Sequence, residues 1–279
     1  MKKNFVLLSV LFFLLFNSCK KEGWPCMKGK GAITKETRSV TGFTSVKIET
    51  ESNVFITQGT EFKVEVEAEE NIVDKIVTEK VGDQLVFHSK RCITTGTINI
   101  YITMPEITGL SIDGKGHIET TDTIDCTSLD LYVNGDGIID VIVVTDNLSA
   151  NIEGGTGDLN ISAIVVNDLD ITSSNAGKIN LLATIGGTLN ANSKGTESMT
   201  LIGSCSEENL LLTGSANLES FAMIANDCHA TTTSGGNLKC YAVNNLWATI
   251  SGEGSIYYKG NPTIVQSTIT GSGQLIDAN

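Results

Sequence analysis

The chain has 279 residues, of which only 18% are charged and 6% are aromatic, and its formal net charge is −13. A surface of that sign repels phosphate backbones, so the charge argues against a nucleic-acid partner. The 28 glycines, together with frequent Thr, Ser, Asn, Val and Ile, favour β structure with many turns. The low number of prolines, 3, argues against a proline-rich stalk.

The first residues have the plan of a secretory signal peptide. Residues 1–4 include two lysines, and residues 5–16 are an apolar run too short to span a bilayer. Residues 15–19 end in Ser18-Cys19 and resemble a bacterial lipobox. We predict that residues 1–18 are removed and that Cys19 carries the lipid. An ordinary signal peptide with a chance cysteine is the alternative.

The residues after Cys19 predict where the protein resides. Lys20-Lys21-Glu22 resembles the surface-export signal of Bacteroidetes-like lipoproteins, with one acidic residue in place of two. We expect an outer-membrane lipoprotein, and its periplasmic or surface-exposed face stays open. Residues 19–39 have few large apolar side chains, so we predict that the lipidated cysteine is followed by a tether.

Residues 40–107 show the alternation of half-buried strands. Apolar and polar residues alternate in 46–49, 62–67 and 98–102, which is the period-two pattern of strands with one buried face. We expect a β-rich N-terminal part made of antiparallel strands. A helical turn is plausible only within residues 71–81.

A repeated pattern fills residues 108–279. An apolar residue, a polar residue, a small residue, a free position, a glycine, a free position and an apolar residue recur in this order, as at 112–118 and 250–256. The glycine or its equivalent returns every 18 to 21 residues, at Gly116, Gly137, Gly157, Gly177, Gly195, Ala216, Gly236, Gly254 and Gly273. Glycine at one fixed phase with a period near 20 indicates a solenoid.

The residue two positions after this glycine is aliphatic in every repeat but one, where Glu197 stands. Aliphatic stacks separated by small-residue corners are typical of a parallel β-helix. We therefore predict an all-β fold, a right-handed, single-stranded parallel β-helix of about nine coils of about 20 residues, each with room for three short strands. The small residue two positions before the glycine suits a corner with positive φ.

Two other folds fit the pattern less well. A leucine-rich repeat needs a higher density of leucines than these intervals contain. An antiparallel sandwich does not explain why glycine recurs at one phase.

Four short stretches resemble one known family. They are VTGF at 40–43, VFITQG at 54–59, YYKGNP at 257–262 and TITGSG at 268–273. They are similar to the putative auto-transporter adhesin, head GIN domain family, and the resemblance covers roughly residues 40–277. It implies a β-helical fold, a secreted or lipid-anchored location and no catalytic residues. The word adhesin itself is an inference from fold, which is a weak argument for function.

Acidic residues at the corners are the strongest candidates for chemistry. Asp113, Asp136 and Asp158 fall near the same corner in successive coils. A polysaccharide lyase needs carboxylates for Ca²⁺ and a basic residue to take a proton. No arginine accompanies these aspartates, so we interpret them as solvated corner residues. We predict no catalytic residue, no metal site and no cofactor, because the three histidines also lack ligand spacing.

Aromatic residues and cysteines leave further questions open. Tyr257 and Tyr258 point to opposite faces if they lie in a strand, and they serve either as a sugar-stacking face or, in the interpretation we favour, as a cap on the last coil. A Cys26–Cys92 disulfide would tie the tether to the first folded part. The pairing stays open among Cys26, Cys92, Cys126, Cys205, Cys228 and Cys240.

The sequence thus predicts a non-enzymatic cell-envelope lipoprotein that serves as an adhesin-like or structural binding module. Its partner is an unknown glycan or an envelope or host protein, and its candidate ligand-facing residues are Tyr257, Tyr258, Asp113 and Asp136. Two alternatives stay open. They are a polysaccharide-active β-helix enzyme, lyase or hydrolase, and a periplasmic scaffold protein.

Overall fold

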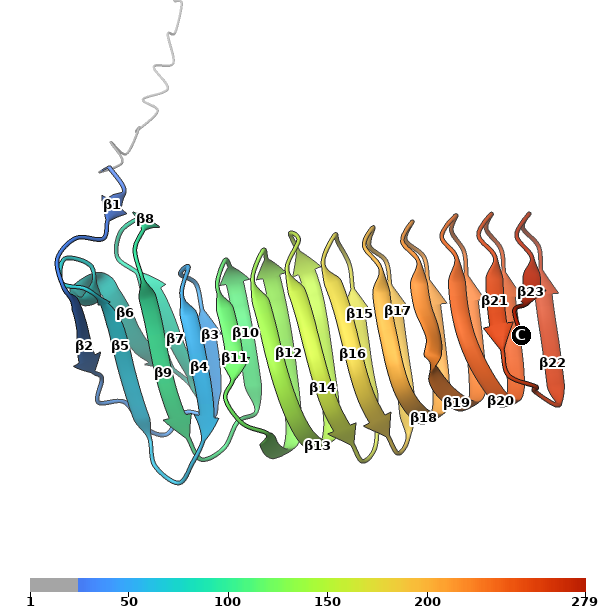
Figure 1. Ribbon diagram of the computed structural model, residues 1–279, viewed down its shortest axis with the longest axis horizontal. Helices are drawn as coiled ribbons and strands as arrows, with labels where there is room; N and C mark the ends of the chain where they lie inside the picture. The colour runs from blue at the N-terminus through green and yellow to red at the C-terminus, as the bar shows by residue number, and fades with distance from the viewer. Residues whose placement is uncertain (1–24) are drawn as a thin grey trace, which may run out of the picture.

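A computed structural model describes residues 25–279, which form an elongated β-solenoid of about eight turns (Figure 1). The expected parallel β-helix is confirmed, since successive coils pair in parallel with a register shift of about 20 residues. The predicted signal peptide and Cys19 lie outside the described residues.

Each regular coil contributes two strands where the sequence suggested three. In one coil β14 (Asp158–Val165) is followed by β15 (Leu169–Ser173), and in the next β16 (Lys178–Ile185) is followed by β17 (Thr188–Ser193). β14 pairs with β16, and β15 pairs with β17. The solenoid therefore has two long flanks of stacked parallel strands, and we call the one that contains β14 and β16 the first flank.

Several strands run from the first flank into the second without a break. These are β13 (Ile138–Gly154), β18 (Met199–Leu212), β19 (Leu218–Thr232) and β20 (Leu238–Ile250). The first flank also contains β11 (His117–Thr120), β21 (Ile256–Lys259) and β23 (Leu275–Asp277). The second flank also contains β10 (Gly109–Gly114), most of β12 (Ile124–Gly135) and β22 (Ile264–Ile269).

The N-terminal part continues the solenoid and then covers its end. β3 (Ser45–Ile48) and β4 (Asn53–Gln58) pair in parallel with β10 and β11, and β7 (Gln84–Ser89) and β9 (Ile98–Met104) stack in parallel on their other side. Antiparallel pairing, expected throughout this part, is limited to the outermost strands. These are β2 (Ile33–Thr37), β5 (Lys63–Glu69) and β6 (Ile76–Val81).

One hydrophobic core runs through the whole described rod. A single cluster of buried side chains extends from Phe43 to Ile256, so the boundary drawn at 107/108 does not separate two cores. The helical turn considered within 71–81 is only the 3₁₀ turn η1 (Val73–Lys75). Antiparallel pairing of β6 with β7 thus decides the structure of a segment whose local sequence also allowed a helix.

The inward stack differs from the predicted one in a single coil. Ile179 pairs with Met199, and Met199 pairs with Leu218. In this coil the inward residue Met199 follows Gly195 by four positions, whereas in the other coils the inward residue follows the glycine by two. Glu197 therefore lies at the corner and not in the stack. The prediction that placed Glu197 there is wrong, because a fixed phase cannot accommodate an insertion.

The glycines that recur in successive coils are needed mainly because these coils approach each other closely. A Cβ atom on Gly177 would lie 2.3 Å from the carbonyl oxygen of Gly157, and one on Gly254 would lie 1.9 Å from the carbonyl oxygen of Gly236. Neither distance is compatible with a side chain. The expectation of positive φ at the small corner residues holds for Gly114, Gly135 and Gly155, and no described non-glycine residue has positive φ.

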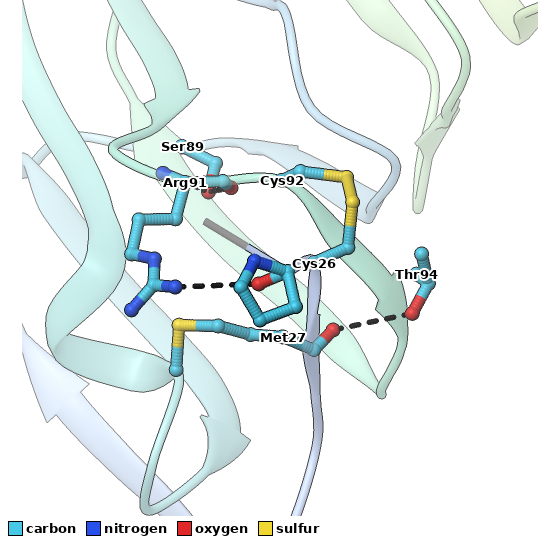
Figure 2. The surroundings of a disulfide bond; sticks show 7 residues. Cys26, Met27, Ser89, Arg91, Cys92 and Thr94 are labelled. Atoms are coloured by element: carbon cyan, nitrogen blue, oxygen red, sulfur yellow. Dashed lines mark hydrogen bonds between the residues drawn. A yellow bond between two sulfur atoms is a disulfide. The ribbon is translucent and has the colours of Figure 1, made fainter. Parts of the chain in front are cut away.

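The tether is shorter than expected, because its second half joins the fold. β1 (Met27–Lys28) pairs in parallel with β8 (Ile93–Thr95), and β2 pairs with β5. A disulfide joins Cys26 to Cys92, which confirms that pairing (Figure 2). Figure 2 also shows the Thr94 hydroxyl donating to the carbonyl oxygen of Met27 over 3.3 Å. The four other described cysteines, Cys126, Cys205, Cys228 and Cys240, are free thiols.

Candidate binding surface

An exposed row of apolar side chains runs along the first flank. Ile142, Ser162, Leu182 and Ile202 are register neighbours in four successive coils, and all four point outward. The exposed fractions of the three large side chains are 47% for Ile142, 55% for Leu182 and 41% for Ile202. We call Ile142, Leu182 and Ile202 the apolar row, which Ser162 interrupts in one coil. Large apolar side chains aligned on one face mark an interaction surface more often than scattered ones do.

A ladder of hydrogen-bonded polar side chains borders the apolar row two residues earlier in each strand. The Nδ2 of Asn160 donates to the carboxylate of Asp140 over 2.6 Å, and the Nδ2 of Asn180 donates to the Oδ1 of Asn160 over 2.8 Å. The Nε2 of His117 lies 2.6 Å from the other oxygen of Asp140. We call Asp140, Asn160 and Asn180 the polar ladder. Because each amide is held by its neighbour, the ladder is a fixed row of polar groups.

The apolar row and the polar ladder line a shallow hollow of about 380 Å³. Glu119 and Thr200 complete its polar border. The surface therefore combines a strip of apolar contact with fixed hydrogen-bonding groups and a negative charge. Such a strip suits an extended partner that lies along the solenoid axis better than a small molecule enclosed on all sides.

The structure places Asp113 and Asp136 at corners, where their carboxylates are already engaged. Asp113 accepts a hydrogen bond from the Nδ2 of Asn134 over 3.0 Å and lies 3.4 Å from the Lys47 ammonium. Asp136 accepts from the backbone N–H of Thr156 over 3.1 Å and from its hydroxyl over 3.0 Å. The backbone hydrogen bond lowers the pKa of the Asp136 carboxyl. These contacts tie one coil to the next.

Asp136 lines a second surface hollow. This hollow has a volume of about 550 Å³ and also contains Lys115, His117 and Glu51. Neither Asp113 nor Asp136 lines the hollow beside the apolar row. The predicted ligand-facing aspartates and the apolar row therefore do not form one site.

Tyr257 and Tyr258 point to opposite faces of β21, as the strand pattern predicts. Tyr257 faces outward in register with Lys239 and Ile276, whereas Tyr258 is half-buried and packs against the core. Burial, together with the adjacent carboxylate of Asp277, raises the pKa of Tyr258. Tyr258 therefore covers part of the last coil's interior, and Tyr257 alone is presented outward.

A buried carboxyl group, which the sequence interpretation missed, lies inside the solenoid. Glu208 is fully buried and pairs in register with Leu189 and Cys228. The Ser220 hydroxyl donates to its Oε1, and the Cys228 thiol donates to its Oε2 over 3.6 Å. Burial raises the pKa of Glu208 to about 8. The signal was present in the sequence, because Glu208 shares the inward phase of Leu210 and Leu212.

Residues 25–279 contain neither a cluster of metal ligands nor a membrane-spanning helix. No group of three or more His, Cys, Asp or Glu side chains in this range is arranged to hold a metal ion. The same residues contain no helix of the length and apolarity that crossing a membrane requires.

The fold defines the chain as an elongated parallel β-solenoid. The chain belongs to the family described as putative auto-transporter adhesin, head GIN domain, whose model matches residues 42–196 and 154–262. The resemblance noted in the sequence is thereby confirmed.

Solved structures support the fold. The chain is similar to a crystal structure described as a putative lipid binding protein from Parabacteroides distasonis ATCC 8503, with 19% identity and a TM-score of 0.68, covering 90% of this chain and 99% of that one. A putative adhesin from Parabacteroides merdae ATCC 43184 matches with 18% identity and a TM-score of 0.68, covering 90% of this chain and 99% of that one. At these identities the likeness establishes the fold alone. No curated protein matches the chain.

Proposed function

We propose that the protein is a non-enzymatic, adhesin-like lipoprotein of the cell envelope and that it binds its partner along the first flank. The observation that carries this proposal is the apolar row, which spans four coils with Ser162 in one of them, beside the polar ladder, which spans three. The family description, which names an adhesin, supports the same kind of role.

The chemistry of the flank indicates what kind of partner it fits. Coils repeat about every 4.8 Å, so the polar ladder presents evenly spaced oxygen and nitrogen atoms to an extended molecule. A glycan chain offers apolar sugar faces and many hydroxyl groups, and a polypeptide strand offers apolar side chains and backbone amides. Both partner classes of the sequence prediction fit, and the absence of cations from the lining described above disfavours strongly anionic polymers.

The contacts of the corner carboxylates favour a structural role over a catalytic one. Asp113 and Asp136 are held by hydrogen bonds within the solenoid, and Asp136 has a lowered pKa. A carboxylate that serves as a general acid needs a raised pKa instead. These residues are therefore proposed as structural ties, and the ligand-facing role passes to the first flank.

An array experiment tests the binding proposal. The purified protein is incubated with arrays of host glycans, bacterial polysaccharides and host surface proteins. Binding to an extended glycan or protein supports the proposal, and the absence of binding to every array component contradicts it. Release of unsaturated or reducing products from array polysaccharides would instead establish the enzyme alternative.

Membrane attachment through Cys19 is tested separately. In cells that express the Cys19→Ala variant we expect the protein to leave the membrane fraction, because it loses the acyl chains that hold it there. Fractionation of cells grown with labelled palmitate measures the membrane association and the acylation of the protein together. Cys126→Ser serves as a matched cysteine control. Unchanged membrane association of Cys19→Ala would contradict the anchor. Protease treatment of intact cells then separates surface display from a periplasmic scaffold, because a periplasmic protein survives.

A further inference from the structure

The two ends of the solenoid differ in how they are closed. At one end the antiparallel strands β2, β5 and β6 lie over the coil that contains β7 and β9 (Figure 1). At the other end β22 pairs only with β20, and β23 pairs only with β21. No described residue covers the outer edges of β22 and β23.

The open end exposes residues that belong to the core stack. Val265 and Ile269 are in register with Leu246 and Ile250, which point into the solenoid and are 0% exposed. Val265 and Ile269 occupy the same inward phase but are 44% and 45% exposed. Among residues 25–279 the last coil therefore has no covering layer, which solenoids generally need at both ends.

The charge distribution indicates what covers this end. Residues 261–276 contain no Asp, Glu, Lys or Arg, although the whole chain carries a net charge of −13. Two copies of an acidic chain repel each other where charged surfaces meet, and a surface without charged side chains avoids this repulsion. At the opposite end β2 carries Lys35 and Glu36, and such charged edge strands resist pairing with another strand.

The sequence of β22 is self-complementary in antiparallel pairing. If Ser267 faces its own copy across a two-fold axis, Val265 of each copy faces Ile269 of the other, and both pairs lie on the core side. On the outer side Gln266 then faces Thr268. The free backbone groups along β22 would pair at the same time, as in any antiparallel ladder. The carboxylate of Asp277 in β23 accepts a hydrogen bond from the Nδ2 of Asn279 over 2.7 Å.

We propose that two copies of this chain join end to end through β22, antiparallel and centred on Ser267. The contact is isologous, so it closes as a dimer and does not propagate into a fibre. Each copy supplies the layer that the other's last coil lacks. The two N-terminal ends then lie at the far ends of a rod of double length, and both first flanks stay free for the binding role proposed above.

Solution mass tests the dimer. The purified full-length chain is expected to show twice the chain mass by light scattering in mild detergent. The Val265→Asp/Ile269→Asp variant is expected to show the mass of one chain, because it places four carboxylates at the contact. Ile33→Asp is the matched control, since Ile33 is 50% exposed on β2 at the other end. Circular dichroism confirms that each variant keeps its β structure.

Cross-linking tests the register independently of any destabilising charge. A chain with Gln266→Cys and a second chain with Thr268→Cys, both in a Cys126→Ser background, are co-expressed and oxidised with copper phenanthroline. The mixture is expected to form the cross-linked dimer, and the Gln266→Cys chain alone is expected to form far less. A monomeric wild-type chain, a dimer lost in Ile33→Asp but kept in the double variant, or equal cross-linking of the single and mixed chains would overturn the proposal.

Discussion

At the scale of single residues, Glu208 occupies a position where the neighbouring coil on one side has Leu189. Transfer of an ionised carboxylate into an apolar interior is costly, so the group holds its proton and its pKa rises to about 8. Hydrogen bonds donated by Ser220 and Cys228 favour the ionised form and offset only part of this rise. The consequence is that the folded chain binds a proton that the unfolded chain releases above pH 4.5.

This proton makes stability depend on pH in a defined direction. The contribution of Glu208 is fully present below the ordinary pKa of 4.5 and is lost as pH rises through about 8. Within that window the free energy of unfolding should fall by about 1.4 kcal/mol per pH unit because of this group. Glu208→Gln should remove that slope, and denaturant unfolding between pH 5 and pH 9 measures it.

Glu207→Gln is the control for this prediction, because Glu207 is the outward-facing neighbour on the same strand. The variant should keep the slope of the wild type. If Glu208→Gln and the wild type lose stability in parallel as pH rises, the buried carboxyl is not the titrating group.

At the scale of elements, the corners depend on glycine for space more than for φ. The first atom of any side chain at Gly177 would lie 2.3 Å from a backbone oxygen of the preceding coil. The strands on both sides of such a corner are fixed by their ladders, so the clash is relieved only by separating two coils. The cost should resemble that of overpacking a core, about 1–3 kcal/mol.

Gly177→Ala should therefore lower the free energy of unfolding by about that amount. Gly235→Ala should have little effect, since a Cβ atom at Gly235 meets nothing within 4 Å. Urea unfolding midpoints of the two variants measure the difference. Equal midpoints would show that the coils can separate without cost and would contradict the close-stacking explanation.

At the scale of the whole molecule, periodicity was the most informative part of the sequence. Glycine at one phase and aliphatic residues two positions later predicted a solenoid, and the structure confirms it. The pattern could not predict the insertion that places Met199 in the stack and leaves Glu197 outside. A fixed period carries no information about corners of variable length.

The direction of strand pairing in the N-terminal part depends on contacts between distant segments, so the local sequence did not reveal it. The parallel pairing of β3 with β10 joins residues 64 positions apart, such as Ser45 and Gly109. Local alternation is the same for parallel and antiparallel strands. The apolar row was missed for another reason. Ile142, Leu182 and Ile202 adjoin inward residues, so they looked like continuous apolar runs until the strands fixed which face each one occupies.

The two proposed surfaces of the rod are separate, with partner binding on the first flank and self-association at β22. They share no residue, so variants of one leave the other intact. This separation lets the binding role be tested without disturbing the dimer.

The most direct test of the binding role is the affinity of flank variants for the strongest ligand found on the arrays. Leu182→Asp/Ile202→Asp should weaken binding at least about tenfold, because burial of one large apolar side chain contributes about 1.5–3 kcal/mol. Ile33→Asp, an equally exposed position away from the flank, should bind as the wild type does. Equal affinity of the flank variant and the wild type would contradict the claim that the apolar row is the binding surface.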